Sequence, residues 1–252
     1  MRSPLRYPGG KSRAVDTILD LMPPGLDCIA SPFFGGGSIE LALVSNGVQV
    51  SGYDIFEPLV AFWQAAINAP QALAKRVAVY HPMNRDIFYS LQKKMRDDRV
   101  LDTDIAAVFF ALNRCSFSGT TLSGGMSPGH PRFTQSSIDR VCNFDSHGLL
   151  SVERLGFEES IARHSNDFLY CDPPYANGGA LYGQRGDCHV DFDHESLAEI
   201  LTSRDGWILS YNDCPIVRDL YAGFTVLDAA WSYGMNSDKK SNEILVLSKD
   251  LM

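Results

Sequence analysis

The sequence lacks the features that mark secreted, membrane-spanning and zinc-stabilised proteins. No apolar run approaches the roughly 20 residues of a transmembrane helix. The N-terminal residues do not combine the charge, apolar stretch and small-residue cleavage site of a signal peptide. The six cysteines include no Cys-x-x-Cys pair, and several lie in apolar runs, as buried free thiols do. We therefore expect a protein of a reducing, cytoplasmic setting with no membrane partner.

The chain also lacks an excess of positive charge. Its formal net charge is −8, which by itself disfavours a nucleic-acid partner. The charges are unevenly spread, because residues 84–142 carry eight basic and six acidic side chains and are weakly positive on an acidic body. A local basic face of this kind can bind DNA, with modest and strongly salt-sensitive affinity.

A glycine-rich loop lies between two expected strands. Gly35-Gly36-Gly37 follows a buried strand expected at 28–30 and precedes a helix expected at 38–45. A second strand, expected at 48–53, ends at Asp54. This order of strand, glycine loop, helix, strand and acid is that of the nucleotide-binding half of a doubly wound fold, whose acid accepts hydrogen bonds from ribose hydroxyls. The chain has no Gly-x-Gly-x-x-Gly sequence, which disfavours an NAD-dependent dehydrogenase.

The middle of the chain departs from this alternation of strands and helices. Its helices are expected at 59–68, 85–97 and 103–113, with Asn84 as N-cap of the second and Asp102 or Thr103 as N-cap of the third. Residues 115–134 are rich in Ser, Thr, Gly and Pro and predict a long loop. We therefore expect residues 58–145 to form an inserted helical subdomain, because the stretch is far longer than one crossover connection needs.

Strands and helices alternate again in the last part of the chain. The strands are expected at 149–154, 167–171, 206–211, 224–229 and 243–248, and the helices near 193–202 and 214–221. We predict an α/β protein whose doubly wound, mostly parallel, Rossmann-like sheet is built from residues 1–57 and 146–252.

The most informative motif is Asp172-Pro173-Pro174-Tyr175, directly after the apolar run at 168–171. The two prolines fix φ and donate no hydrogen bonds, so the chain must leave the sheet here with free carbonyl groups. Asp172 and the Pro173 carbonyl can each accept one hydrogen from a single exocyclic amino group. Tyr175 can stack on the planar ring that carries this group. The motif therefore suits an amine that attacks an electrophile.

Segments spread over almost the whole chain carry a resemblance to a known family. They are residues 4–13, 32–38, 53–55, 112–114, 117–119, 172–175, 210–213 and 242–245. In this order they resemble the motifs of the D12 class, or Dam-like, DNA adenine-N6 methyltransferases, which use S-adenosylmethionine (SAM). The resemblance implies a class I methyltransferase fold, SAM as cofactor and double-stranded DNA as partner. It implies an enzyme that methylates adenine N6 within a specific sequence.

The resemblance also implies roles for individual residues. The cofactor-binding residues are expected to be Tyr7, Gly9, Lys11, Phe33, Phe34, Gly35, Gly37, Asp54, Ile55 and Asp172. The catalytic residues are expected to be Asp172, Pro173, Pro174 and Tyr175, with the adenine flipped out of the helix to reach them. The DNA-contacting residues are expected to be Asn113, Arg114, Phe117, Ser118, Gly119 and Leu122.

Two positions depart from the family pattern. Family members that read GATC often carry Tyr-Asn-Gly and then an arginine three residues past the glycine, whereas this chain has Phe-Ser-Gly at 117–119 and then Leu122. A bidentate contact of arginine with guanine is therefore absent at that position. Ser31 stands where the family commonly has glutamate before Pro-Phe, which alters the expected network at the amino end of SAM. The target sequence, the oligomeric state and a role in restriction-modification stay open.

Other functions stay open as well. The same pocket suits methyl transfer to RNA adenine, cytosine N4 or a protein amide, and a SAM- or DNA-binding homologue without catalysis is a further alternative. The aspartate at 172 and the Asn113-Arg114 pair favour a base in DNA, and the intact motif at 172–175 disfavours the silent homologue. No metal is expected, because the Cys, His and Asp residues at 188–194 match no closed zinc pattern and Asp193 is better interpreted as an N-cap.

Overall fold

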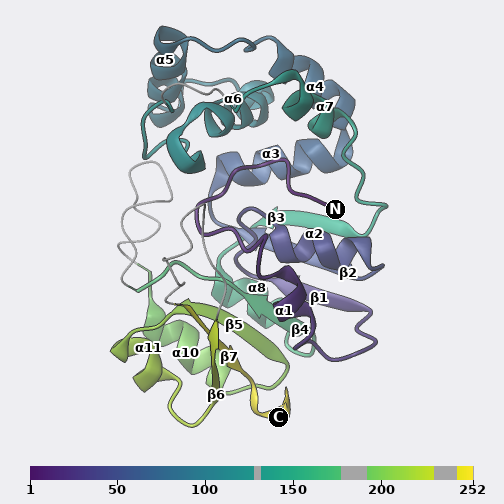
Figure 1. Cartoon of the computed structure of the whole chain (residues 1–252), viewed down its shortest axis with the longest axis vertical. Coiled ribbons are helices and arrows are strands. Elements are labelled where there is room, and N and C mark those ends of the chain that lie inside the picture. Colours follow the sequence, from purple (N-terminus) through teal and green to yellow (C-terminus); the bar gives the residue numbers. More distant parts are fainter. Residues whose placement is uncertain (128–131, 177–191, 230–242, 252) are drawn as a thin grey trace.

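The protein is an α/β structure built on one mixed sheet (Figure 1). The computed structural model describes residues 1–127, 132–176, 192–229 and 243–251. Its strands are β1 (Cys28–Ser31), β2 (Gln49–Asp54), β3 (Leu150–Arg154), β4 (Phe168–Cys171), β5 (Trp207–Asn212), β6 (Thr225–Ala229) and β7 (Glu243–Leu247). Within the described residues these form a 7-stranded sheet in the order β3-β2-β1-β4-β5-β7-β6.

The strand order reverses beside β1. β1 pairs in parallel with β2, where Ile29 lies opposite Val50, and with β4, where Ile29 lies opposite Phe168. β3 and β5 extend the parallel part, whereas β7 is antiparallel to both β5 and β6. The predicted α/β fold with a mostly parallel sheet is therefore confirmed. In such sheets ligands bind outside the carboxyl ends of the strands at the point of reversal.

Two hydrophobic cores lie on opposite faces of this sheet, because successive side chains of a strand point to opposite faces. In β4, Phe168 and Tyr170 belong to one core and Leu169 and Cys171 to the other. The first core contains buried residues of α1 (Val15–Leu19), α2 (Ser38–Ser45) and α3 (Glu57–Asn68). The second contains those of α8 (Phe157–Arg163), α10 (His194–Thr202) and α11 (Pro215–Leu220). Helices on both faces make the sheet doubly wound.

A separate group of helices lies at one end of the molecule, away from the sheet (Figure 1). They are α4 (Pro70–Ala78), α5 (Arg85–Arg96), α6 (Asp102–Cys115) and α7 (Gln135–Cys142), and the 3-10 turn η1 (Phe117–Gly119) follows α6. A second such turn, η2 (Lys249–Leu251), follows β7. Because α3 packs against β2 and β3 as well as against α6, we propose that the inserted subdomain begins after α3 rather than at residue 58.

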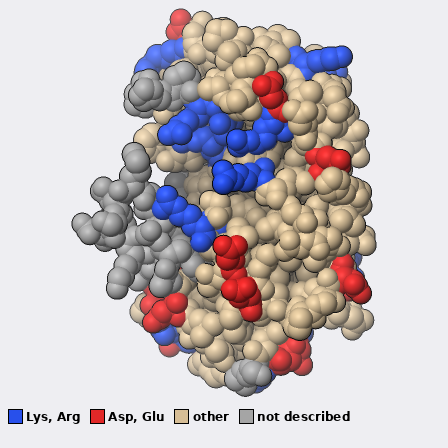
Figure 2. Space-filling view, turned by 45° about the vertical axis from the view of Figure 1, so that its right-hand side comes forward, with Lys and Arg blue, Asp and Glu red and all other residues tan. Residues whose placement is uncertain are grey.

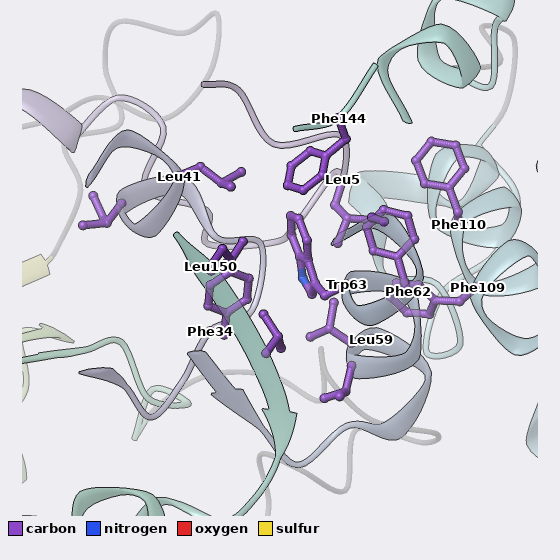
Figure 3. Close-up of a cluster of buried hydrophobic side chains, with 14 of the residues drawn as sticks. Leu5, Phe34, Leu41, Leu59, Phe62, Trp63, Phe109, Phe110, Phe144 and Leu150 are labelled. Carbon is purple, nitrogen blue, oxygen red and sulfur yellow. The ribbon is translucent and has the colours of Figure 1, made fainter. Parts of the chain in front are cut away.

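An aromatic cluster joins this helical group to the glycine-rich loop (Figure 3). Phe62 of α3 stacks on Phe110 of α6 with ring centroids 5.4 Å apart. The neighbouring Trp63 meets Phe34 edge to face at 5.1 Å, and Leu5 of the N-terminal segment belongs to the same core. Both parts of the molecule therefore position the loop.

Two of the predicted helix caps are confirmed and one is wrong. The side chains of Asn84 and Asp193 each accept a hydrogen bond from the backbone of the first turn, at 2.8 and 2.9 Å. Helix α6 instead follows Leu101, which makes no side-chain hydrogen bond as N-cap, so neither Asp102 nor Thr103 caps it.

The described cysteines are free thiols, and those at 115, 171 and 214 are buried. In the described part of the chain, no helix combines the length and the apolar character needed to cross a membrane.

Gly52 of β2 lies against the Phe34 ring, and we expect this contact to tolerate no side chain. A Cβ at Gly52 would lie 2.2 Å from Phe34 Cδ2, and Phe34 is itself packed against Trp63. Gly52→Ala should lower the free energy of unfolding by about 1–3 kcal/mol, the usual cost of overpacking. Urea denaturation measures this, with Ser51→Ala on the opposite face of the same strand as control. Equal unfolding free energies for the two variants would contradict the packing argument.

Candidate active site

A cavity of about 460 Å³ lies at the carboxyl ends of β1, β2 and β4. Its walls include residues 7–11, 32–40, 54–56, 156–158 and 172–175. These parts are distant in the sequence and meet because the parallel strands end at the same edge of the sheet. Every residue predicted to bind the cofactor or to act in catalysis lies on this cavity.

The glycine-rich loop leaves no room for side chains at its turn. Gly35 has φ +49°, and a Cβ there would lie 2.8 Å from Cε1 of the Tyr7 ring. The loop is fixed from below by Trp63, whose Nε1 donates to the Gly35 carbonyl at 3.0 Å. Phe34 is buried in the core beneath the loop, whereas Phe33 is only half-buried and stacks on Phe157 at 5.8 Å. The loop thus presents backbone and one aromatic face to the cavity.

Asp54 stands at the end of β2 and is held by the loop that it faces. Its Oδ2 accepts from the Gly35 amide at 3.1 Å, and its Oδ1 accepts from the Phe56 amide at 2.9 Å. Burial raises the pKa of Asp54, and these backbone N–H groups oppose the rise. The Ile55 N–H is a third such donor, and a carboxylate has about four acceptor positions, so one position remains for a ligand hydroxyl. The exposed Ile55 beside it also lines the cavity.

Lys11 is buried and holds the Asp-Pro-Pro-Tyr turn. Its Nζ lies 2.8 and 2.9 Å from the two carboxylate oxygens of Asp172, 2.7 Å from Tyr175 Oη and 3.0 Å from the Gly9 carbonyl. Tyr175 Oη donates to Glu243 Oε1 at 2.7 Å. Burial raises the pKa of Asp172, and the Lys11 cation opposes this rise. The lysine therefore favours an ionised carboxylate, which is the form that accepts hydrogen bonds.

The turn itself is anchored to the neighbouring strand. The Ala176 amide donates to Asn212 Oδ1 of β5 at 3.0 Å. The Tyr175 ring lies 6.0 Å from that of Tyr211, and Lys11 Nζ lies 5.0 Å from the Tyr175 ring centroid. These contacts fix the aromatic face and leave Tyr175 only half-buried.

Two buried glutamates belong to the site and were missed as site residues from the sequence. Glu243 is the first residue of β7 and accepts a hydrogen bond from the Tyr175 hydroxyl. Its segment at 242–245 resembles a family motif, but Glu243 was not predicted as a site residue. Glu40 lies in the first turn of α2 and on the cavity wall, and its Oε1 accepts from Ser31 Oγ at 2.6 Å. Burial raises the pKa of Glu40 to about 7. An acid inside an otherwise apolar helix pattern was the available signal.

The described residues include no group of three or more His, Cys, Asp and Glu side chains placed to hold a metal ion. Residues 188–191 of the stretch weighed as a metal site lie outside the described residues, and Asp193 caps α10.

The side chains of two residues predicted to contact DNA are buried. Asn113 has 0% of its surface exposed, and its amide both accepts from the Arg6 N–H at 2.9 Å and donates to the Arg6 carbonyl at 2.7 Å. Leu122 is also 0% exposed. A direct contact with DNA does not fit these positions, because both side chains are enclosed by protein. Asn113 instead ties the N-terminal segment to α6.

Of the neighbouring predictions, Phe117 and Ser118 lie at the surface. Phe117 has 62% of its surface exposed, Ser118 is exposed with φ +52°, and the buried Gly119 has φ +79°. Arg114 is half-buried, and its guanidinium donates to the Arg132 carbonyl at 2.8 and 3.0 Å. These residues place an aromatic ring and a cation at the end of α6.

Four arginines from distant segments form a positive cluster. They are Arg6, Arg114, Arg132 and Arg140, and the latter two are exposed. Burial and the three neighbouring guanidinium groups lower the pKa of Arg114 to about 10. The ion pairs between described residues include none of the four. Figure 2 shows basic side chains gathered around a hollow on one face of the molecule. The sequence prediction named only Arg114.

The fold and its cavity are those of a class I methyltransferase, and comparison with known families narrows the class. Residues 7–235 match the model of the D12 class N6 adenine-specific DNA methyltransferases. The chain belongs to this family of enzymes, so the predicted family is confirmed.

Curated relatives are DNA methyltransferases of similar length. The type II methyltransferase M.CviBI of Paramecium bursaria Chlorella virus NC1A is 20% identical, over 97% of this chain and 96% of the relative. The retron Ec67 DNA adenine methylase of Escherichia coli is 24% identical, over 98% and 92%. A DNA adenine methylase of Vibrio cholerae is 26% identical, over 88% and 85%. The similarity thus includes both the sheet and the helical insert.

Proposed function

We propose that this protein transfers the methyl group of SAM to N6 of an adenine in DNA, within a short target sequence. The observation that carries the proposal is the position of Asp172. Its carboxylate is held by Lys11 on the same cavity as the glycine-rich loop and Asp54. An acceptor for an amine and the elements of a nucleotide site therefore share one space. A cytoplasmic location is part of this proposal.

The cavity fits SAM in its chemistry. The residues proposed to hold it are Tyr7, Gly9, Lys11, Phe33, Phe34, Gly35, Gly37, Asp54, Ile55 and Asp172. The remaining acceptor capacity of Asp54 suits a ribose hydroxyl, and the positive φ of Gly35 brings backbone rather than side chain to the cavity. When bound, SAM supplies a methyl group made electrophilic by the adjacent sulfonium charge.

Asp172 and Pro173 act on the adenine amine. The lone pair of this amine is delocalised into the ring, so the amine is a weak nucleophile. Asp172 and the Pro173 carbonyl each accept one N–H, which localises the lone pair and stabilises the positive charge as it develops. Lys11 keeps Asp172 ionised for this role. Pro174 has no N–H, so no backbone donor follows the Pro173 carbonyl.

Tyr175 receives the base. An adenine inside a duplex cannot reach the cavity, so we propose that it is flipped out of the helix. The ring of Tyr175 is fixed through its hydroxyl by Lys11 and Glu243, which preorganises a face for stacking.

The arginine cluster provides the phosphate contacts in this proposal. Arg6, Arg114, Arg132 and Arg140 concentrate positive charge next to the exposed Phe117, and phosphate contacts set the register of a protein on DNA without reading sequence. We propose that Asn113 and Leu122 act indirectly, by positioning the N-terminal segment and the loop after α6.

Arg140→Gln should weaken DNA binding and make the affinity less dependent on salt concentration, because it removes a proposed phosphate contact. Each lost phosphate contact makes the negative slope of log K against log salt shallower by about 0.9. Fluorescence anisotropy at several salt concentrations measures the slope. Arg163→Gln on α8, where the arginine pairs with Glu153 and Glu159, is the matched control. An unchanged slope for Arg140→Gln would remove this residue from the interface.

The overall proposal is tested by methyl transfer from labelled SAM to unmethylated genomic DNA, followed by mapping of the modified adenines. N6-methyladenine in one short motif is the expected result, and a motif other than GATC would agree with the leucine at 122. Label in RNA or protein, with none in DNA, would overturn the substrate. SAM binding without transfer to any of them would favour a non-catalytic homologue.

A further inference from the structure

Glu40 is a buried carboxylate that has no role in the proposed methyl transfer. Its side chain is 2% exposed. Among the described residues, the side-chain hydrogen bond that it accepts comes from Ser31 Oγ. Burying a carboxylate is costly unless it is fully paired. The nearby cation, Lys11, has Nζ 2.8 and 2.9 Å from the two oxygens of Asp172 instead. Glu40 therefore keeps acceptor capacity in the cavity.

Capping of its own helix accounts for only part of the acceptor capacity of Glu40, because the capping contact that it makes is with its own backbone N–H. A glutamate at this position of a helix often accepts from the backbone N–H of the N-cap residue. Here the N-cap is Gly37, and its N–H donates to the Phe34 carbonyl at 2.9 Å. The side chain instead reaches Ser31 at the end of β1, on the cavity wall.

We propose that Glu40 binds the primary ammonium group of an amino acid attached to the nucleoside cofactor. The inference rests on the proposed function and deepens it. Asp54 marks the ribose end of the same cavity, and Lys11 and Asp172 lie close enough to Glu40 to act on it electrostatically. An ammonium group complements a carboxylate that has only a hydroxyl as side-chain partner. Glu40 thus supplies from α2 the acid that is absent at position 31.

The first test compares two ligands by titration calorimetry. S-adenosylhomocysteine carries the amino acid, and 5′-methylthioadenosine lacks it. Glu40→Gln keeps the shape and the acceptor for Ser31 but removes the charge, so it should weaken S-adenosylhomocysteine binding at least about tenfold, the effect of a charge-assisted hydrogen bond. Binding of 5′-methylthioadenosine should stay within about twofold, as one expects for a group that contacts only the ammonium. Glu159→Gln on the exposed face of α8 is the matched control.

The second test needs no variant. The groups that face Glu40 are Lys11, Asp172, Tyr170 and Ser31. An ammonium group beside Glu40 lowers its pKa from about 7, so binding at pH 7 should release roughly half a proton. Titrations in buffers of different ionisation enthalpy measure this release. It should occur with S-adenosylhomocysteine, not with 5′-methylthioadenosine, and should fall in Glu40→Gln.

Equal losses of affinity for both ligands, or none for either, would overturn the role of Glu40, as would identical proton release with both. Ser31→Ala separates packing from binding, since a purely structural pair predicts that this variant weakens both ligands as much as Glu40→Gln does. If the wild-type protein bound neither ligand, the proposed function itself would fail. If the wild-type protein bound both ligands and Glu40→Gln lost affinity for both equally, only the assignment of Glu40 to the ammonium group would be disproved.

Discussion

Asp172→Asn is expected to lower the rate of methyl transfer by about 100-fold or more, the range seen when one preorganised partner of the transition state is removed. The substitution keeps the shape of the side chain. It replaces one acceptor oxygen with an N–H donor and removes the charge that stabilises the methylated amine. Asparagine also leaves the buried Lys11 without the carboxylate that lies 2.8 Å from its Nζ. Single-turnover transfer from labelled SAM measures the rate.

DNA binding separates this effect from loss of structure. The affinity of Asp172→Asn for DNA should stay within about tenfold of wild type, because phosphate contacts dominate that affinity and Asp172 lies in the cofactor cavity. Glu153→Gln, an exposed carboxylate on β3, serves as the control and should retain full activity. Normal turnover by Asp172→Asn would disprove the proposed mechanism.

Lys11→Met is expected to destabilise the protein by about 3–5 kcal/mol, the usual cost of removing one partner from a buried ion pair. The effect should grow with pH. The pKa of Asp172 is raised in the folded protein, so its contribution to stability is present below the unfolded pKa near 3.9 and is lost as pH rises through the folded pKa. Without Lys11, which opposes that rise, the loss extends to higher pH.

Activity should respond in the same direction. Without the lysine, Asp172 is protonated over a wider range, so the rise of kcat with pH should move to higher pH. Denaturant unfolding from pH 4 to 8 and a kcat profile over the same range check both parts. Lys75→Met, an exposed lysine on α4, is the matched control. A stability loss that is independent of pH would mean that Lys11 contributes through packing alone.

The sequence predicted most of the sheet because its strands are short apolar runs closed by glycine, proline or acidic residues. Helix α4 is absent from the predicted helices, and its first residue is a proline, which inside a helix would break it. In the structure Pro70 is the first residue of α4, where a missing N–H costs nothing. Helix α7 is also absent from the predicted helices; it begins at Gln135, directly after the predicted loop, with Thr134 and Ser137 forming a capping box.

The cofactor side of the site was more predictable than the DNA side. The predicted cofactor-binding residues lie together because β1, β2 and β4 are parallel neighbours, so their carboxyl ends meet at one edge of the sheet. The order of the motifs along the chain is enough to predict this arrangement. The arginine cluster depends on tertiary packing of segments more than 100 residues apart, such as those of Arg6 and Arg114. Asn113 looked like a surface residue at a helix end, yet its amide is turned inward onto the N-terminal backbone. No local pattern reveals that direction.

The N-terminal segment has a consequence for how the two substrates influence each other. Arg6 lies in the arginine cluster, and Tyr7 packs on the glycine-rich loop. A few residues later, Lys11 forms an ion pair with Asp172, the proposed catalytic residue. In the proposed function, one short stretch of chain contacts both DNA and the cofactor. If DNA binding orders that stretch, it raises the affinity for the cofactor. By thermodynamic linkage, cofactor binding then raises the affinity for DNA by the same factor. We therefore expect the binding of DNA and the binding of the cofactor to be coupled through a single piece of backbone.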